Sequence, residues 1–187
     1  MRLPWSDEAR LDRLAVRARG GDRDAFRDLY RALHPRVAGF AARRTARRED
    51  AEDAVSRTFH RLLERLDGYD AGRGTIVAFA LAIARNLLLD DARARRASVP
   101  LEEAAAELVV QRTPLDGVLA DERLRAARAR LDAMPPEVRE LFALRYGDGL
   151  SLREIAGLVG ASEDAVKQRF SRALRALREP DGQEVLA

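Results

Sequence analysis

Hydrophobic residues recur every three or four positions along most of the chain, which is the period of an amphipathic helix. We expect a first helix that Ser6 caps and that ends at Gly20, and a second that starts at Asp22 or its neighbour. Pro35 should break or kink the second helix, because proline removes a backbone hydrogen bond. A third helix is expected to begin near Arg48.

A glycine-rich loop separates these helices from a longer one that we expect from about Thr75 to Arg96. The loop, residues 67–74, holds three glycines and a tyrosine, Tyr69, that looks exposed. The first half of the long helix is apolar nearly all round and should be buried, whereas its second half turns strongly polar.

The helical period dissolves over residues 98–114, which contain two prolines and three glutamates and therefore predict a linker. Beyond it, a helix is expected from about Val118 to Leu131, with Ala127 on its buried side, and another around Pro136. The chain is therefore predicted to be all-α. It should comprise two small helical domains, residues 1–97 and 118–187, joined by a flexible linker over residues 98–117.

The stretch from Leu150 to Arg178 predicts a helix-turn-helix. Ser151 and Glu154 form a capping box, Gly160 suits the left-handed end of the first helix, and Ser162 caps the second. A basic outer face alone usually marks a solvated helix, but the turn and both caps favour binding in the major groove of DNA. The candidate DNA-binding residues are Lys167, Gln168, Arg169, Ser171, Arg172 and Arg175.

The composition adds a local charge imbalance to this picture. Of the 187 residues 47% are hydrophobic and only 5% aromatic, so the core is built mainly from Ala, Leu and Val. The formal net charge is +3, yet residues 1–97 carry 21 basic and 15 acidic side chains, whereas residues 134–187 carry 8 and 9. Because phosphate neutralisation dominates non-specific DNA affinity, the C-terminal domain alone should bind DNA weakly and work as one arm of a larger assembly.

Four acidic residues crowd the start of the third helix. Acids are ordinary there, since negative charge suits the helix dipole, but that role explains one or two of them better than four. A basic partner surface would explain all four. The candidates for this protein-binding site are Glu49, Asp50, Glu52 and Asp53.

The sequence offers little for an enzyme. Cysteine is absent, which excludes disulfides and cysteine-ligated metals, and there are only two histidines. The sequence has neither a glycine-rich phosphate loop nor the paired Glu-x-x-His motifs of a di-iron bundle, and Asp90-Asp91 is better explained as a surface pair than as a metal site. We expect no catalytic residues, no metal and no cofactor.

The sequence likewise gives no reason to expect a membrane protein. Its first residues lack the apolar core of a signal peptide, and the longest apolar run, from Thr75 to Ala84, is too short to span a bilayer. We expect a soluble, cytoplasmic protein without membrane insertion.

Two blocks of the sequence together resemble one family. The N-terminal block reads Asp-Ala-Glu-Asp-Ala-Val from Asp50, then Thr58-Phe59, then Ile-Ala-Arg-Asn-Leu-Leu-Leu-Asp from Ile83. The C-terminal block reads Met-Pro-Pro-Glu-Val-Arg-Glu-Leu-Phe from Met134 and Ala-Val-Lys-Gln-Arg-Phe-Ser-Arg-Ala from Ala165. In this order, with an acidic linker between them, they resemble the extracytoplasmic-function (ECF) sigma factors, the two-domain alternative sigma subunits of bacterial RNA polymerase.

The resemblance implies a division of labour. Residues 1–97 would be a region 2-like domain that binds core polymerase and melts the −10 element, and residues 118–187 a region 4-like domain that reads the −35 element. The four acids would dock on the polymerase clamp, and Tyr69 would offer a flat surface to a melted base. The residues implied at the −10 element are Asp67, Tyr69, Asp70 and Arg73 of the loop and Phe79, Asn86, Arg93 and Arg96 of the helix that follows.

Two positions depart from the family pattern. Phe79 stands where a tryptophan is usual, so the surface for stacking a base is smaller. Ser56 lies near the position where the family usually has a glutamine, and this difference concerns the detail of docking on the polymerase clamp. The partners implied are core RNA polymerase, promoter DNA and an anti-sigma factor. The alternative is an autonomous helix-turn-helix regulator, which would need its own ligand or dimer domain, and residues 26–96 give no sequence signal of a ligand pocket.

Overall fold

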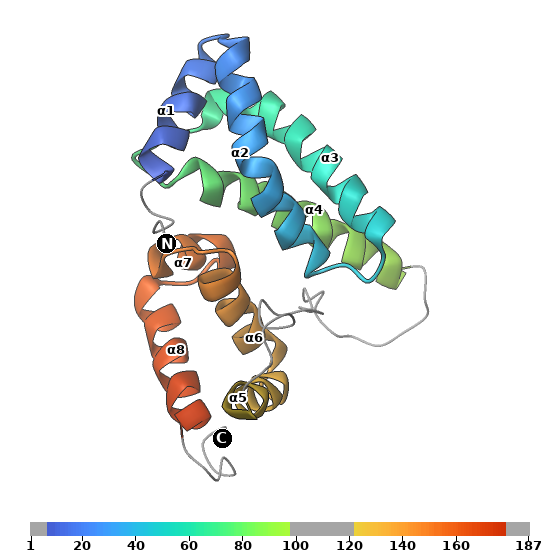
Figure 1. Cartoon of the computed structure of the whole chain (residues 1–187), viewed down its shortest axis with the longest axis vertical. Coiled ribbons are helices and arrows are strands. Elements are labelled where there is room, and N and C mark those ends of the chain that lie inside the picture. Colours follow the sequence, from blue (N-terminus) through green and yellow to red (C-terminus); the bar gives the residue numbers. More distant parts are fainter. Residues whose placement is uncertain (1–6, 98–121, 179–187) are drawn as a thin grey trace. The chain divides into compact units, whose positions relative to one another are not determined.

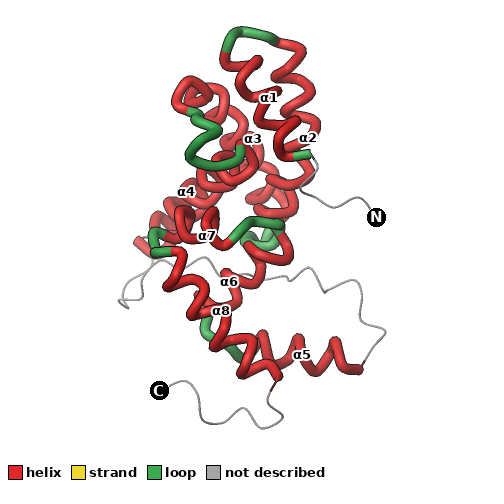
Figure 2. The backbone as a smooth tube through the Cα atoms, turned by 90° about the vertical axis from the view of Figure 1, so that its left-hand side faces the viewer, coloured by secondary structure: helices red, strands yellow, loops and turns green. Residues whose placement is uncertain are grey.

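A computed structural model of the chain describes residues 7–97 and 122–178. In these two ranges every regular element is helical, and Figure 2 accordingly draws only helices and loops there. The chain divides into two compact units, residues 1–111 and 112–187. The all-α fold with two helical domains is therefore confirmed. The limits of the expected linker, residues 98–117, lie at or beyond the edge of the described residues and stay a prediction.

Over residues 7–97, the N-terminal unit contains four α-helices, α1 (Glu8–Arg19), α2 (Arg23–Ala42), α3 (Arg48–Arg65) and α4 (Ile76–Ala97), and a short 3-10 turn (Leu66–Gly68) after α3. Helix α2 packs against α1, α3 and α4, and α1 also contacts α4 (Figure 1). The core is mainly aliphatic and also includes the buried aromatic side chains of Phe40, Phe59 and Tyr69. Its fully buried large residues are Leu29, Leu33, Val37, Phe40, Leu62, Ile76, Val77, Leu81 and Leu88.

The ends of α1 and α2 follow local signals. Asp22 caps α2 as expected, its carboxylate accepting the Ala25 N–H at 2.9 Å. Ser6, the expected cap of α1, lies outside the described residues. Of the break or kink expected at Pro35, the break does not occur, because the helix runs through this residue. Pro35 lies on the exposed side of α2, where water can satisfy the carbonyl that loses its hydrogen bond.

The C-terminal unit contains α5 (Glu122–Asp132), α6 (Pro136–Phe142), a π-helical turn (Ala143–Gly147), α7 (Leu152–Val159) and α8 (Glu163–Arg178). The expectation that Ala127 is buried is wrong, because this residue is exposed and α5 reaches the core through Leu131 near its C-terminal end. At the same end of α5, Arg130 donates to the Leu177 carbonyl at 3.0 Å. The buried side chains of the unit are Leu131, Leu141, Phe142, Leu144, Leu150, Ile155, Val166, Phe170 and Ala173, among others.

Within the described ranges, no helix combines the length and the apolar character needed to cross a bilayer. That matches the short apolar run in the sequence, most of which is now buried in α4: Ile76, Val77, Ala80, Leu81 and Ala84 contact the core of the N-terminal unit.

Candidate nucleic-acid interface

The turn between α7 and α8 has the geometry of a helix-turn-helix. The Ser151 hydroxyl accepts the Glu154 N–H at 3.2 Å, and the Glu154 carboxylate accepts the Ser151 N–H at 2.9 Å, which completes the expected capping box. Gly160 ends α7 in the left-handed conformation with φ +69°. Ser162 then caps α8 by accepting the Ala165 N–H at 3.1 Å. Local contacts thus define both ends of the turn.

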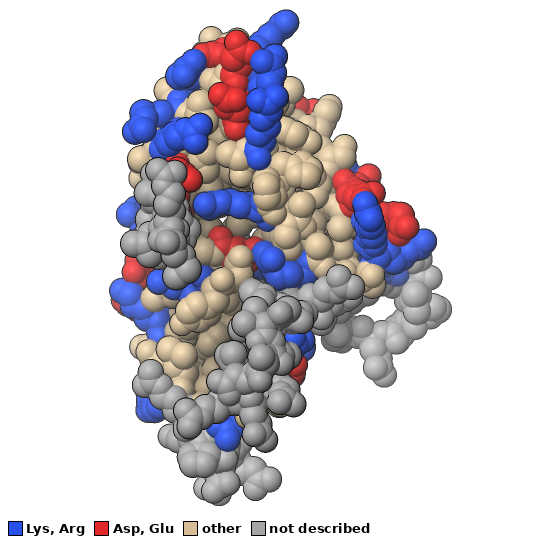
Figure 3. All heavy atoms as spheres, viewed as in Figure 1, with Lys and Arg blue, Asp and Glu red and all other residues tan. Residues whose placement is uncertain are grey.

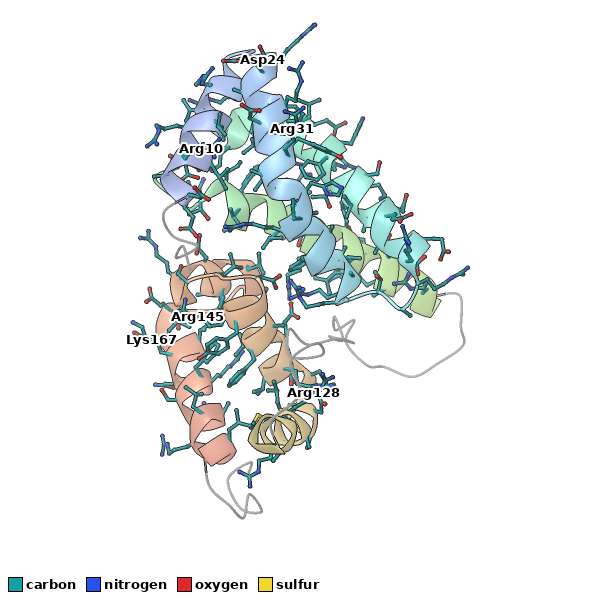
Figure 4. The ribbon with its side chains drawn as sticks, viewed as in Figure 1. Arg10, Asp24, Arg31, Arg128, Arg145 and Lys167 are labelled. Atoms are coloured by element: carbon teal, nitrogen blue, oxygen red, sulfur yellow. The ribbon has the colours of Figure 1, made fainter. Side chains whose placement is uncertain are left out.

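The outer face of α8 carries all six expected DNA-binding side chains, and each of them is exposed. Lys167 projects from α8 away from α6 and α7 (Figure 4). Its ammonium lies 3.1 Å from the Glu163 carboxylate and 3.8 Å from that of Asp164, and these carboxylates raise its pKa. Within the described residues, Arg169, Arg172 and Arg175 have no such partner, so their charges remain available to a ligand.

The inner face of α8 packs against the rest of the C-terminal unit. Phe170 of α8 lies 5.0 Å from the Phe142 ring of α6, measured between centroids, and locks α8 against the unit. Arg145, labelled in Figure 4, donates to the Leu150 carbonyl at 2.9 Å and so ties the chain that enters α7 to the π-helical turn. Helix α8 is therefore packed through its inner face against the rest of the unit.

The loop before α4 has an exposed and ordered tip. The Asp70 carboxylate accepts the Gly72 N–H at 2.9 Å, and the Asp70 carbonyl accepts the Arg73 N–H at 3.0 Å, which together form a compact turn. Asp67, Asp70 and Arg73 are exposed. The Arg73 guanidinium has no partner among the described residues. This tip offers one free cation and two carboxylates to a ligand.

Tyr69 lies differently from the sequence expectation. We expected an exposed flat surface, but the side chain is 2% exposed and its hydroxyl donates to the Asp12 carboxylate of α1 at 2.7 Å. Its ring lies 5.6 Å from that of Phe79, which is half-buried. Burial and the Asp12 carboxylate raise the pKa of the Tyr69 hydroxyl. The expectation of an accessible ring was wrong because the partner lies on a distant helix, which loop composition does not indicate.

The polar end of α4 contributes fewer free charges than its sequence suggests. Asn86 is exposed, whereas Arg93 pairs with Asp90 at 3.1 Å. Asp91 accepts from Arg57 of α3 at 2.9 Å, which explains this acid as part of an ion pair between helices. Arg96 is helical, but its side chain lies outside the described residues. In the ranges that the structure describes, no group of three acidic or histidine side chains could hold a metal ion.

The four acids at the start of α3 are exposed or half-exposed, and each faces an arginine. Glu52 lies 2.7 Å from Arg48 and Asp53 lies 3.2 Å from Arg57. Longer separations of 3.8 and 3.9 Å join Glu49 to Arg47 and Asp50 to Arg95. Figure 3 shows acidic and basic side chains side by side over this part of the unit. The acids are therefore partly neutralised within the chain, but their outward oxygens stay accessible.

A hollow between α2 and α3 was not indicated by the sequence. It encloses about 470 Å³ beside the acids, and its lining includes Tyr30, His34, Glu52, Ser56 and Phe59. The rings of Tyr30 and Phe59 lie 4.4 Å apart, and Tyr30 is 39% exposed. The one available signal was the spacing of Tyr30 and His34, four residues apart and hence on one side of α2. Ser56, noted above as a departure from the family pattern, opens onto this hollow.

Two family models match the two units. The model described as Sigma-70 region 2 matches residues 29–98, and the model described as Sigma-70, region 4 matches residues 124–177. The first match contains α3, the loop and α4 and most of α2, and the second contains the helix-turn-helix. Helix α1 lies outside both.

Similar proteins cover nearly the whole chain. ECF RNA polymerase sigma factor SigF of Caulobacter vibrioides is 33% identical over 175 residues, which are 92% of this chain and 94% of SigF. ECF RNA polymerase sigma factor BldN of Streptomyces coelicolor is 34% identical over 176 residues, which are 92% of this chain but 66% of BldN, just under two thirds of its length.

Two solved structures share the fold. The sigma factor RpoE of Bartonella quintana, crystallised with the anti-sigma factor NepR, matches with a TM-score of 0.60 at 23% identity, over 82% of this chain and 94% of RpoE. CnrH, in complex with the cytosolic domain of CnrY, matches with a TM-score of 0.56 at 25% identity, over 89% of this chain and 94% of CnrH.

Proposed function

Because this chain belongs to the ECF subfamily of RNA polymerase sigma factors, we propose that its two units divide promoter recognition between them. The chain is an alternative sigma factor that directs promoter-specific transcription. It is not a free-standing regulator, since its N-terminal unit matches sigma region 2.

The C-terminal unit reads the −35 element through α8. The observation that carries this proposal is the outer face of that helix, where Arg169, Arg172 and Arg175 have no partner within the described residues. Guanidinium groups without intramolecular partners can form bidentate bonds to guanine in the major groove or neutralise phosphates. Gln168 and Ser171, both exposed beside them, add neutral hydrogen-bonding groups. Lys167, held by two acids of its own helix, is the weakest member of the set.

The N-terminal unit binds and melts the −10 element through the loop tip. Asp67, Asp70 and Arg73 are the accessible members of the site, and Asn86 and Arg93 lie on α4, the helix that follows the loop. Opening requires a base to be captured outside the stack, at a cost of a few kcal/mol that new contacts must offset. Tyr69 contributes by holding the loop from beneath. Phe79, half-buried against Tyr69, offers only part of its ring for stacking.

The start of α3 docks on core RNA polymerase. Solvent reaches the outward oxygens of the four acids, Glu49, Asp50, Glu52 and Asp53. Beside them, the hollow lined by Tyr30 and Phe59 offers an apolar binding surface. A partner with a basic rim and an apolar centre would complement both. The chain catalyses no reaction of its own and acts in the cytoplasm, where core polymerase works.

We further infer that an anti-sigma factor controls the chain. CnrH, whose fold this chain shares at 25% identity, is bound to the cytosolic domain of CnrY. If such a factor holds this protein, a tagged copy recovered from cells in which the protein is inactive should carry it in place of core polymerase. Recovery of core polymerase alone under every growth condition would refute this part of the proposal.

Promoter opening tests the −10 assignment. The double variant Asp70→Ala/Arg73→Ala removes the polar groups of the loop tip, and we expect it to bind core polymerase and to form the closed complex normally but to open duplex promoters poorly. A template whose −10 region is already mismatched should restore transcription. The control is Asp24→Ala/Arg27→Ala, which removes an exposed pair of α2 joined at 2.6 Å. Equal loss on both templates would show that the tip is not the opening device.

A further inference from the structure

Helix α1 holds the loop before α4 at both of its ends. The same carboxylate oxygen of Asp12 accepts the Tyr69 hydroxyl at 2.7 Å and the Ile76 N–H at 2.8 Å. Arg19, two turns further along α1, donates to the Tyr69 carbonyl at 3.0 Å. The segment from Tyr69 to Ile76 is therefore fixed to one helix at its first and last residue.

Each of these contacts has a clear physical basis. Ile76 is the first residue of α4, and its N–H has no acceptor within that helix, so the carboxylate of Asp12 serves as a cap supplied by another helix. Negative charge at this end also suits the dipole of α4. The Tyr69 hydroxyl is buried and must find an acceptor, which Asp12 provides. One charged group thus satisfies two donors.

The loop tip between the two anchors is exposed and already shaped. Its turn is closed by the Asp70 carboxylate, which accepts the Gly72 N–H at 2.9 Å. Where the loop meets α4, the Thr75 hydroxyl caps the helix by accepting the Ala78 N–H at 3.2 Å. A loop that is ordered before it binds loses less conformational entropy on binding than a mobile one. The anchors on α1 therefore bear directly on how readily the tip can engage DNA.

We propose that α1 positions the −10-contacting loop, with Asp12 as the positioning residue and Arg19 in support. The inference rests on the proposed role of the loop tip at the −10 element. It assigns a task to a helix that lies outside the residues matched to sigma region 2, since the match begins at residue 29 and α1 ends at Arg19. Asp12 acts through Tyr69 and Ile76 and touches no DNA itself.

The first measurement is amide hydrogen exchange of the full-length protein. In the variant Asp12→Ala, the Ile76 amide loses its acceptor, so it and the amides of residues 70–75 should exchange at least tenfold faster, because a charge-assisted hydrogen bond is lost. The matched control is Arg17→Ala on the same helix, which removes a surface pair with Asp22 at 2.6 Å and should leave those amides unchanged. Unchanged exchange in Asp12→Ala would overturn the proposal.

The second measurement is the rate of promoter opening with core polymerase. We expect Asp12→Ala to slow opening of duplex DNA about tenfold, since the loop must be ordered at that moment, and to be rescued on a pre-opened template. Tyr69→Phe keeps the buried ring and removes only the hydroxyl, so it should slow opening less. The double variant Asp12→Ala/Tyr69→Phe should open duplex DNA no more slowly than Asp12→Ala alone, because both changes break the same hydrogen bond.

The loop-tip variant Asp70→Ala/Arg73→Ala serves as the reference in the same assay. If that variant fails to open duplex DNA while folded Asp12→Ala and Tyr69→Phe open it at the wild-type rate, α1 has no positioning role. If all three open it normally, the −10 assignment is wrong and the inference fails with it. Should Asp12→Ala not fold, Tyr69→Phe carries the test: opening at the wild-type rate would overturn the proposal.

Discussion

In the proposed reading of the −35 element, ion pairing within α8 decides which of its exposed cations are available to DNA. Lys167 and Arg172 look equivalent in the sequence, but the ammonium of Lys167 lies 3.1 Å from Glu163 of its own helix, whereas Arg172 has no partner within the described residues. A cation already paired within the chain has part of its charge compensated before it contacts DNA, so it gains less from that contact. The free guanidinium of Arg172 is not compensated in this way and can present two donors to one base.

The variant Arg172→Ala should cost about 1–3 kcal/mol of binding free energy at the preferred −35 sequence, because a bidentate base contact is lost. Transcription should fall accordingly, and selectivity should relax at one base pair. Lys167→Ala, the matched variant on the same face, should have a smaller effect that is uniform across −35 sequences. Transcription from a set of −35 variants measures both. A uniform loss with Arg172→Ala would reduce Arg172 to a phosphate contact.

At the scale of secondary-structure elements, the helix-turn-helix depends on backbone geometry as much as on side chains. Gly160 has φ +69° at the end of α7, and a Cβ there would meet no neighbouring atom within 4 Å. The cost of any other residue at this position is therefore conformational. Gly157 lies in the last turn of α7, which ends at Val159, and its surroundings are equally open; glycine there has the opposite effect and weakens the helix.

These two glycines form an internal comparison. Gly160→Ala should destabilise the protein by about 1–2 kcal/mol, because alanine is forced into the left-handed region. Gly157→Ala should stabilise it by about 0.5–1 kcal/mol through better helix propensity. Thermal unfolding of the full chain, followed by circular dichroism, measures both changes. Destabilisation of similar size by both variants would mean that the turn does not require its left-handed residue.

Features that depend on residues close together in the sequence could be predicted from it, whereas features that depend on distant residues could not. The starts of α2, α7 and α8 were predictable because Asp22, Ser151 and Ser162 cap amides only three residues away. The burial of Tyr69 was not, because its partner, Asp12, lies 57 residues earlier. The hollow between α2 and α3 and the Arg57–Asp91 pair depend in the same way on distant segments.

At the scale of the whole molecule, the chain must bind a large partner as well as DNA. The acids at the start of α3 are partly neutralised by arginines, so a basic partner gains from them only through their outward oxygens. Glu49 and Asp53 are the most exposed of the four, at 77% and 64% of the side chain. Arg57 also holds Asp91, so the tie between α3 and α4 survives the loss of Asp53.

The double variant Glu49→Gln/Asp53→Asn should therefore weaken binding to core polymerase while the helix content and thermal unfolding of the free protein stay close to wild type. The control is Asp24→Asn/Asp28→Asn, which removes two exposed acids of α2 that face Arg27 and Arg31. Competition for core enzyme against an unmodified labelled copy measures the difference. Equal affinity of both double variants would leave the α3 acids with no role beyond their interaction with the helix dipole.

In the proposed function, one chain directs core polymerase to two DNA elements through two separate units. The most direct measurement is transcription by core polymerase and this protein from a library of duplex templates randomised in the −35 and −10 elements, with the transcribed templates then sequenced. We expect selection at both elements, with Arg172→Ala altering base preference only at −35 and Asp70→Ala/Arg73→Ala only at −10. Selection no greater than with core polymerase alone, or a shift of the same element by both variants, would refute this division of promoter recognition.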